Sequence, residues 1–358
     1  MSTPKDTQKI ERERLRISII SAEMRPGHGG ISLVARLMVK ALSFSESVRC
    51  VTLTERPEPD LGVDVSAAGG SKFKFGALLA RELFARRALI YDFGGLARLH
   101  PRHFVHYACW MHGVEAWEGA AASRIPPLKH ANLLLSNSQH TLARAERTFG
   151  EFRNAEVCWL GTESDEPPSP PSTNGPPTLL TLARIDEPGY KGHNEILEVW
   201  PRVVARVPDA RWIVAGGGPG AAHFRRRAAD SSAADTIHVR GFVEERDIAE
   251  LWGKATAFAM PSRGEGFGLV YVEAMRNRIP VLASVHDAGG EINVHQETGF
   301  NVDLTRAGEL EEQIVSLLAD RGEARRMGEA GFRRWQAHFS FSAFRNRFLP
   351  LVTRYAAE

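Results

Sequence analysis

Short apolar segments typical of buried strands alternate with amphipathic helical segments along almost the whole chain. LRISIIS (15–21) has the pattern of a buried strand, and ISLVARLMVKAL (31–42) repeats its apolar residues with the period of a helix. Strands that are joined by helices run parallel, and helices cover both faces of their sheet. The alternation therefore predicts an α/β fold of the doubly wound, Rossmann-like type.

The same pattern predicts where the elements lie. The expected strands are 15–21, 48–55, 87–93, 104–110, 132–138, 178–185, 210–218, 236–243 and 256–262. The expected helices include 31–42, 193–207, 246–255 and 269–277. The strands fall into two series, because none of them lies between residues 138 and 178.

One segment separates the two series. EPPSPPSTNGPP (166–177) is dominated by proline, serine and glycine, which cannot continue a helix or a central strand. A chain of 358 residues is also long for a single core. We therefore expect an N-terminal domain over 1–165, a linker over 166–177 and a C-terminal domain over 178–339, with a ligand-binding cleft between the domains.

Charge and cysteine content exclude several functions. The 45 Lys and Arg against 43 Asp and Glu give a net charge of +2, so no basic field indicates a nucleic-acid partner. Cys50, Cys109 and Cys158 lie too far apart in sequence for a zinc motif or a disulfide framework. The leader 1–16 lacks the apolar run of a signal peptide, and no apolar run is long enough to span a bilayer. These features predict a cytoplasmic protein.

GEGFG (264–268), which follows the expected strand 256–262, has the strongest chemical signal in the chain. It should form a turn before the helix 269–277, so its Gly-Phe-Gly residues would lie at a helix N-terminus. Free N–H groups and the helix dipole attract a phosphate at such a position. Glycine lets the backbone approach that phosphate closely.

Two glutamates flank this turn. Glu265 lies just before the expected helix and Glu273 about five residues inside it, so their carboxylates would be on the order of 10 Å apart. The spacing suits a ligand with hydroxyl groups on both sides of a phosphate, because a carboxylate accepts a pair of hydrogen bonds from a vicinal diol. Taken alone, a helix cap and a solvated helix residue explain the pair equally well.

Cations are expected at the same edge of the sheet. ARIDEPGYKGHNEI follows the first strand of the second series and places Arg184 and Lys191 in one loop. A guanidinium group binds two phosphate oxygens at once, and a lysine adds a point charge. GGGPG (216–220) is a further loop in which the backbone can approach a ligand, although a glycine run by itself is a weak signal.

The second half of the chain resembles glycosyltransferase family 4, whose members are retaining enzymes with the GT-B fold of two facing Rossmann-like domains. Four stretches show the resemblance in the family's order: LARIDEPGYKG, WIVAGGGPG, IHVRGFV and MPSRGEGFGLVYVEAM. PVLASVHDAGGEINVHQETGF extends it, so that it covers residues 178–303. GEGFG with its spaced glutamates is the most specific part.

The resemblance implies a binding site for a nucleotide-diphosphate sugar. Arg184 and Lys191 would hold the diphosphate, while Glu273 would bind the ribose hydroxyls and Glu265 the hexose hydroxyls. The other donor-binding residues that it implies are Gly217, Gly266, Phe267, Gly268 and Leu269.

The N-terminal half resembles the family more loosely. Gly29 and Gly30 in RPGHGGISL match the family's glycine loop near the donor phosphate and the acceptor, and His28 in that loop could touch a substrate. His112 in CWMHGVEAW resembles the histidine that reaches the donor sugar. The implied catalytic residues are Glu265, His112, Arg184 and Lys191. The resemblance also implies that a C-terminal helix over about 340–358 returns to the N-terminal domain.

The implied reaction moves a hexose from a UDP- or GDP-sugar to a hydroxyl of a glycan, lipid-linked or small-molecule acceptor, with retention of configuration, in polysaccharide or glycoconjugate biosynthesis. No Asp-x-Asp motif stands where a metal site would be expected. Arg184, Lys191 and helix-end amides would therefore stabilise the diphosphate, and we expect no metal ion and no other cofactor.

The sequence leaves alternative activities and one further contact open. A glycosidase that uses Glu265 and Glu273 is disfavoured by the neighbouring cations, whereas a GT-B nucleotide-sugar epimerase and a catalytically idle sugar-nucleotide-binding subunit remain alternatives. The segment 81–104 could lie on the inner face of the cytoplasmic membrane as a basic amphipathic surface, with Arg86 and Arg87 facing the lipid.

Overall fold

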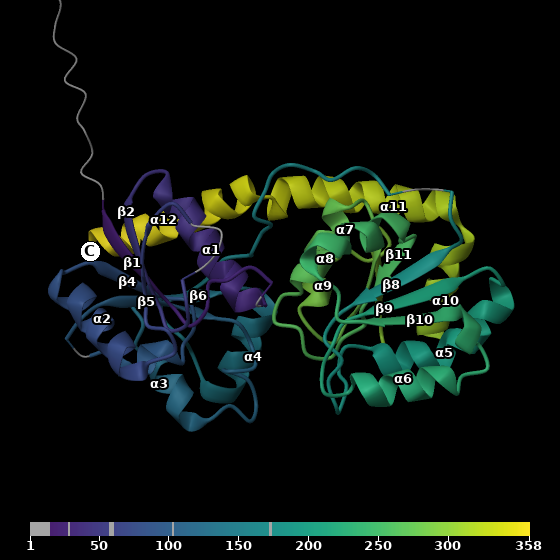
Figure 1. Ribbon diagram of the computed structural model, residues 1–358, viewed down its shortest axis with the longest axis horizontal. Coiled ribbons are helices and arrows are strands. Elements are labelled where there is room, and N and C mark those ends of the chain that lie inside the picture. The colour runs from purple at the N-terminus through teal and green to yellow at the C-terminus, as the bar shows by residue number, and fades with distance from the viewer. Residues whose placement is uncertain (1–14, 28, 57–60, 102–103, 172–173) are drawn as a thin grey trace, which may run out of the picture.

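Two α/β domains lie side by side in the computed structural model, which describes residues 15–27, 29–56, 61–101, 104–171 and 174–358 (Figure 1). Every strand pair in both sheets is parallel. This confirms the predicted α/β fold of two Rossmann-like domains in the GT-B arrangement.

The N-terminal sheet has seven strands in the order β3-β2-β1-β4-β5-β6-β7. Its strands are β1 (Arg16–Ser21), β2 (Ser47–Thr52), β3 (Asp64–Ala67), β4 (Ala88–Tyr91), β5 (Tyr107–Met111), β6 (Leu133–Ser136) and β7 (Ala155–Val157). In the centre of the sheet, Ile19 of β1 pairs with Cys50 on one side and Ile90 on the other. The strand order reverses between β1 and β4, and a doubly wound sheet forms a crevice at such a point.

The C-terminal sheet has six strands in the order β10-β9-β8-β11-β12-β13. They are β8 (Thr178–Leu182), β9 (Arg211–Ala215), β10 (Ile237–Gly241), β11 (Ala257–Ala259), β12 (Val281–Ser284) and β13 (Gly299–Val302). Here the order reverses between β8 and β11. The loop with Arg184 and Lys191 follows β8, and GEGFG follows β11, so both loops lie at this crevice.

Helices cover both sheets (Figure 1). Their bounds are α1 (Gly30–Ser43), α2 (Lys72–Phe84), α3 (Ile125–Lys129), α4 (Gln139–Phe149), α5 (His193–Arg206), α6 (Ala221–Ala229), α7 (Glu245–Lys254), α8 (Leu269–Arg276), α9 (Gly289–Ile292), α10 (Glu309–Ala319), α11 (Arg321–Arg334) and α12 (Phe341–Ala357). Among the described residues, none of the helices combines the length and the apolar content needed to cross a bilayer.

The chain connects the two domains twice. The first connection leads into the proline-rich segment, where the Arg276 guanidinium of α8 donates to the Glu166 carbonyl at 2.6 Å. The second is the π-helical turn Trp335–Phe339 between α11 and α12. Figure 1 shows that α12 lies over the N-terminal domain beside α1, and its Tyr355 hydroxyl donates to the Leu89 carbonyl of β4 at 3.0 Å.

β12 and three edge strands lie outside the segments that the sequence pattern predicted as strands. β3 and β7 form the two edges of the N-terminal sheet and are four and three residues long, with most of their residues only half-buried. β13 has the sequence GFNV and begins with a glycine. β3, β7 and β13 are short and lack the longer apolar run that indicates a strand in the sequence.

Candidate functional site

The turn before α8 has the geometry of an open helix N-terminus. The helix begins at Leu269, and Gly268 precedes it with φ of 89°, a left-handed conformation that favours glycine. No side chain caps this helix. Gly266 lies against the His112 carbonyl of the other domain, and a Cβ at this position would overlap that oxygen. Glycine is therefore required where the turn meets the N-terminal domain.

Lys191 and Glu265 meet beside this turn. The Lys191 ammonium forms an ion pair with Glu265 Oε1, and the two side chains are 15% and 14% exposed. Burial lowers the pKa of Lys191 to about 8, while the charges of Asp287 and Asp186 act to raise it. The lysine therefore remains protonated at neutral pH, as the direct contact with a carboxylate also requires.

Asp287, to which the sequence analysis gave no role, holds the same turn from a third loop. Its Oδ2 accepts the Glu265 N–H at 2.9 Å, and its Oδ1 accepts the Gly289 N–H at 2.9 Å. Burial raises its pKa to about 6, against the lowering effects of the Gly289 N–H, the Ser262 hydroxyl and the Lys191 charge. The sequence feature that could have indicated this role is the position of Asp287 directly before an Ala-Gly-Gly run.

Glu273 lies in the fifth position of α8 and is half-buried. Burial raises the pKa of its carboxyl to about 7, and the negative charge of Glu245 at the start of α7 acts in the same direction. Arg276 partly opposes this effect. Near neutral pH this carboxyl can therefore gain or lose a proton when a polar ligand approaches it.

Arg184 and Gly217 are not in contact with the Lys191–Glu265 pair. The Arg184 side chain is 69% exposed and pairs with Asp186 Oδ1 at 2.8 Å. Gly217 follows β9, and its carbonyl accepts the Ile185 N–H at 2.8 Å. The glycine loop thus supports the loop that contains Arg184 and Lys191.

His112 follows β5 at the facing edge of the N-terminal sheet. Its Nε2 bonds to the Asp92 carbonyl at 2.6 Å, and its ring stacks on Trp110 with 6.0 Å between the centroids. Because a carbonyl only accepts, Nε2 is the protonated nitrogen and Nδ1 is left as an acceptor. The Asn137 amide donates to the His112 carbonyl at 3.0 Å and fixes the loop that meets Gly266.

Asp92, which the sequence analysis did not single out, is fully buried behind His112. The Ser21 hydroxyl donates to its Oδ2 at 2.6 Å, whereas its Oδ1 has no hydrogen-bond partner within the described part of the chain. Burial raises the pKa of Asp92 to about 7. Its main chain and side chain link the ends of β1, β4 and β5 at the crevice.

The start of α4 joins the two domains at this point. The hydroxyls of Ser138 and Thr141 donate to the Gly266 carbonyl at 2.6 and 3.0 Å. Glu291 of α9 accepts the Gln139 and His140 N–H groups at 2.9 and 3.0 Å. Ser138 also caps α4 by accepting the Thr141 N–H at 3.0 Å. Sequence reasoning missed the contacts between the domains, because the partners are more than 120 residues apart.

The N-terminal glycine loop faces α8 across the crevice. A Cβ on Gly30 would lie 3.4 Å from a methyl group of Leu269, and a Cβ on Gly27 would lie 3.7 Å from a Glu245 carboxylate oxygen. Gly29 is the N-cap of α1, with φ of 90°. His28 lies outside the described residues. The structure thus brings Gly30 and Leu269, both predicted site residues, to opposite sides of one narrow gap.

No group of three or more His, Cys, Asp or Glu side chains is arranged to hold a metal ion in the residues that the structure describes. The polar groups of the crevice are cations, amides and carboxyls that do not converge on one point. This set of groups suits an anionic ligand with hydroxyl groups.

Comparison with known proteins supports this interpretation of the crevice. Residues 163–334 match the family model of glycosyl transferases group 1. The chain is 29% identical over 215 residues to a GDP-mannose-dependent alpha-(1-6)-phosphatidylinositol monomannoside mannosyltransferase of Mycobacterium tuberculosis H37Rv, covering 55% of each chain. It is 33% identical over 143 residues to the uncharacterized glycosyltransferase YqgM of Bacillus subtilis 168, covering 39% of each. The match thus spans about half the length of the first relative and less of the second.

Solved structures share the whole fold. Alr3699/HepE of Anabaena, in complex with UDP, superposes with a TM-score of 0.79 at 15% identity and covers 95% of this chain and 100% of its own. Sucrose-phosphate synthase of Thermosynechococcus elongatus gives a TM-score of 0.79 at 20% identity and covers 96% and 100%. At 15% and 20% sequence identity, this structural similarity is evidence for a shared fold.

Proposed function

We propose that the protein is a retaining glycosyltransferase that moves a hexose from a nucleotide-diphosphate sugar to an acceptor hydroxyl. The observation that supports it most directly is the Lys191–Glu265 ion pair beside the uncapped start of α8. These residues lie within the segment that matches glycosyl transferases group 1. A cation, free amides and a carboxylate are thereby placed together at the crevice.

The chemistry of these groups fits diphosphate departure. The Phe267 and Gly268 amides and the protonated Lys191 would stabilise the negative charge that develops on the leaving diphosphate. An arriving phosphate would attract Lys191 away from Glu265, leaving that carboxylate to accept hydrogen bonds from the hexose hydroxyls. Arg184 is largely exposed and pairs with Asp186 through Nε, so its terminal N–H groups would bind the same phosphate while that pair is kept. In this proposal no metal ion takes part.

Glu273 and His112 would bind the two ends of the donor. An ionised Glu273 accepts both hydroxyls of a ribose, which favours its charged form once the nucleotide is bound. His112 presents Nδ1 as an acceptor from the opposite domain, where a hexose hydroxyl could donate to it. The Gly29–Gly30 loop would then cover the diphosphate from the N-terminal domain.

The relatives suggest the first donor and acceptor to test. The mannosyltransferase named above uses GDP-mannose, according to its name. We therefore propose GDP-mannose as the first donor, ahead of UDP-sugars, and a lipid-linked or glycan hydroxyl as the acceptor. Transfer to such a lipid would make the protein peripheral to the inner face of the cytoplasmic membrane.

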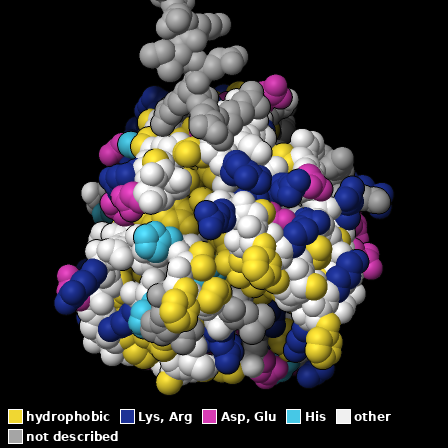
Figure 2. Space-filling model, turned by 90° about the vertical axis from the view of Figure 1, so that its left-hand side faces the viewer, with side chains coloured by type: hydrophobic (Ala, Val, Ile, Leu, Met, Phe, Trp, Pro, Cys, Tyr) yellow, Lys and Arg dark blue, Asp and Glu magenta, His cyan; other side chains and the backbone are white. Residues whose placement is uncertain are grey.

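One face of the N-terminal domain has the properties needed for that contact. Phe73 and Phe84 of α2 are 96% and 89% exposed. Lys72 and Lys74 beside Phe73 are also exposed, and Glu82, the one acidic residue of this helix, is buried. Figure 2 views this end of the molecule and shows hydrophobic side chains with Lys and Arg among them. Exposed aromatic rings with surrounding cations favour binding to an anionic bilayer.

The proposed lipid contact of Arg87 is wrong. Its side chain is buried, its Nη2 donates to the Ile17 carbonyl at 2.8 Å, and its Nε lies 3.6 Å from Glu82 Oε2. The guanidinium satisfies groups inside the domain and is therefore not available to lipid headgroups. Arg86 is exposed.

A panel of nucleotide-sugars tests the proposed activity, with released nucleotide as the readout in the presence and absence of acceptors. A transferase releases nucleotide faster when its acceptor is added. Lys191→Met should lower kcat about 100- to 1,000-fold, because it removes a charge that stabilises the transition state. Lys254→Met is the matched control, since Lys254 pairs with Glu250 on the exposed face of α7.

Other outcomes identify the alternatives. Interconversion of the donor sugar without any acceptor would indicate an epimerase. Tight nucleotide-sugar binding without turnover of any donor would indicate an idle binding subunit.

A further inference from the structure

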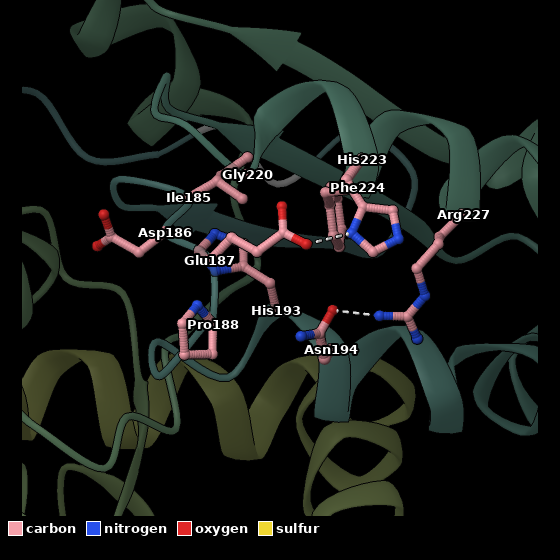
Figure 3. Close-up of a pocket in the computed structure, with 11 residues that line it drawn as sticks. Ile185, Asp186, Glu187, Pro188, His193, Asn194, Gly220, His223, Phe224 and Arg227 are labelled. Atoms are coloured by element: carbon pink, nitrogen blue, oxygen red, sulfur yellow. Dashed lines mark hydrogen bonds and ion pairs between the residues drawn. The ribbon is translucent and has the colours of Figure 1, made fainter.

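A cavity lies beside the loop that connects Arg184 to Lys191. It has a volume of about 360 Å³ and is lined by residues 185–189 of this loop, by the first residues of α5, and by residues of α6 as far along as Arg227 (Figure 3). None of Arg184, Lys191, Glu265 and Glu273 lines it. The cavity is therefore separate from the proposed donor site, although one loop borders both.

His193 forms the buried part of the cavity wall. Its side chain is 4% exposed, and its Nε2 has no hydrogen-bond partner in the part of the chain that the structure describes. Burial lowers its pKa to about 4, and the nearby Lys191 charge acts in the same direction, so the ring is neutral at physiological pH. A buried ring nitrogen without a partner is costly, which indicates that a ligand or water atom completes its hydrogen bonding.

Arg227 and Asn194 supply further donors from two different helices. Figure 3 shows Arg227 of α6 and Asn194 of α5 joined across the cavity, and Arg227 Nη1 donates to Asn194 Oδ1 at 2.5 Å. Asn194 is the one hydrogen-bond partner of this guanidinium among the described residues. The bond fixes the orientation of the guanidinium and leaves its other N–H groups for a ligand.

The two helices also begin at the cavity. α5 has 14 residues and α6 has nine, and glycines occupy both N-cap positions, Gly192 and Gly220. Neither helix has a side-chain cap. Their first-turn N–H groups and their dipoles therefore add to the donors already described.

The acidic groups of the cavity already have partners. Glu187 Oε1 lies 2.9 Å from His223 Nδ1, a contact drawn in Figure 3. Asp186 Oδ1 lies 2.8 Å from Arg184 Nε. One oxygen of each carboxylate is thus paired, while the N–H groups of Arg227, Asn194 and the two helix N-termini remain for a ligand that supplies oxygen atoms.

We propose that this cavity binds a phosphate group, supplied by free inorganic phosphate or by a phosphomonoester, at a site distinct from the nucleotide-sugar crevice. A tetrahedral oxyanion offers oxygens to the Arg227 fork, to the Asn194 amide and to the helix N-termini at the same time. His193 would donate to a fourth oxygen through Nε2. The bound group would also restrain residues 185–189, and with them the positions of Arg184 and Lys191.

Isothermal titration of the full-length protein with inorganic phosphate tests the proposal. We expect saturable binding that Arg227→Gln weakens at least about tenfold, because it removes charge-assisted hydrogen bonds while Gln can still reach Asn194. The matched control is Arg226→Gln, since Arg226 is exposed on the same helix and does not line the cavity. This control should bind phosphate as the unaltered protein does.

Two further arms complete the test. Lys191→Met should keep the Arg227-dependent binding, because Lys191 belongs to the donor crevice. A titration with glucose 1-phosphate distinguishes the sources: tighter binding than that of inorganic phosphate indicates a phosphomonoester, and equal or weaker binding indicates free phosphate. Equal phosphate affinity of Arg227→Gln and the unaltered protein, or complete loss of binding in Lys191→Met, would overturn the proposal.

Discussion

At the scale of single residues, Glu273 has a carboxyl whose environment opposes its charge. Its pKa of about 7 lies above the ordinary value of 4.5, because burial and the Glu245 charge favour the neutral form. The folded protein therefore binds this proton more tightly than the unfolded chain does. The ionised Glu273 carboxyl destabilises the folded protein. This destabilisation is absent below pH 4.5, grows as the pH rises to 7 and is complete above 7.

Glu273→Gln should consequently stabilise the ligand-free protein at pH 8 by about 1–3 kcal/mol and have little effect at pH 4.5. Denaturant unfolding at a series of pH values measures this difference. Glu198→Gln on the exposed face of α5 is the control, and it should change the free energy of unfolding by less than about 0.5 kcal/mol at every pH. A stabilisation that does not vary with pH would contradict the raised pKa of Glu273.

At the scale of elements, α2 differs from an ordinary surface helix. Phe75 and Leu79 pack into the domain, while Phe73 and Phe84 project almost completely into solvent. The proposed partner is an anionic bilayer, and the cations beside the rings would give the binding a dependence on salt.

The double substitution Phe73→Ser with Phe84→Ser should reduce binding to phosphatidylglycerol-containing vesicles by at least about tenfold, because each ring loses apolar area that would enter the bilayer. Vesicle co-sedimentation measures the bound fraction. Phe242→Ser removes an equally large ring, 73% exposed, from the C-terminal domain and should leave the binding unchanged. Equal loss in both variants, or none in either, would argue against α2 as the contact.

At the scale of the whole molecule, the Gly266 carbonyl is among the groups that link the two domains. The Gly266 carbonyl receives hydrogen bonds from Ser138 and Thr141 of the N-terminal domain, and it belongs to the turn that precedes α8. The domain interface therefore helps to set the direction in which this turn points. In the proposed function, Thr141 would then influence donor affinity without touching the donor.

Thr141→Val should weaken binding of the released nucleoside diphosphate about fivefold, since a buried hydrogen bond contributes about 1 kcal/mol. Titration calorimetry measures the dissociation constant. Thr141→Ser keeps the hydroxyl and should bind as the unaltered protein does. If Val and Ser behave alike, the hydrogen bond to Gly266 does not position the turn.

The sequence by itself determined the features that depend on neighbouring residues. Alternating apolar patterns predicted two parallel-stranded domains, and the Gly-Phe-Gly turn predicted the start of α8 at Leu269. Arg184 and Lys191 are in one loop because a single strand-to-helix connection contains both of them. Glycine conformation and hydrophobic period are local properties, so a linear sequence is sufficient to read them.

Only the tertiary structure decided which distant groups meet and which charges are buried. Arg86 and Arg87 look alike in sequence, yet one is exposed and the other is buried next to Glu82. Thr141 reaches Gly266 across 125 residues, and Glu245 acts on the pKa of Glu273 from another helix. Such contacts depend on how two sheets and their helices pack together, and burial, which sets these pKa values, exists only once that packing is complete.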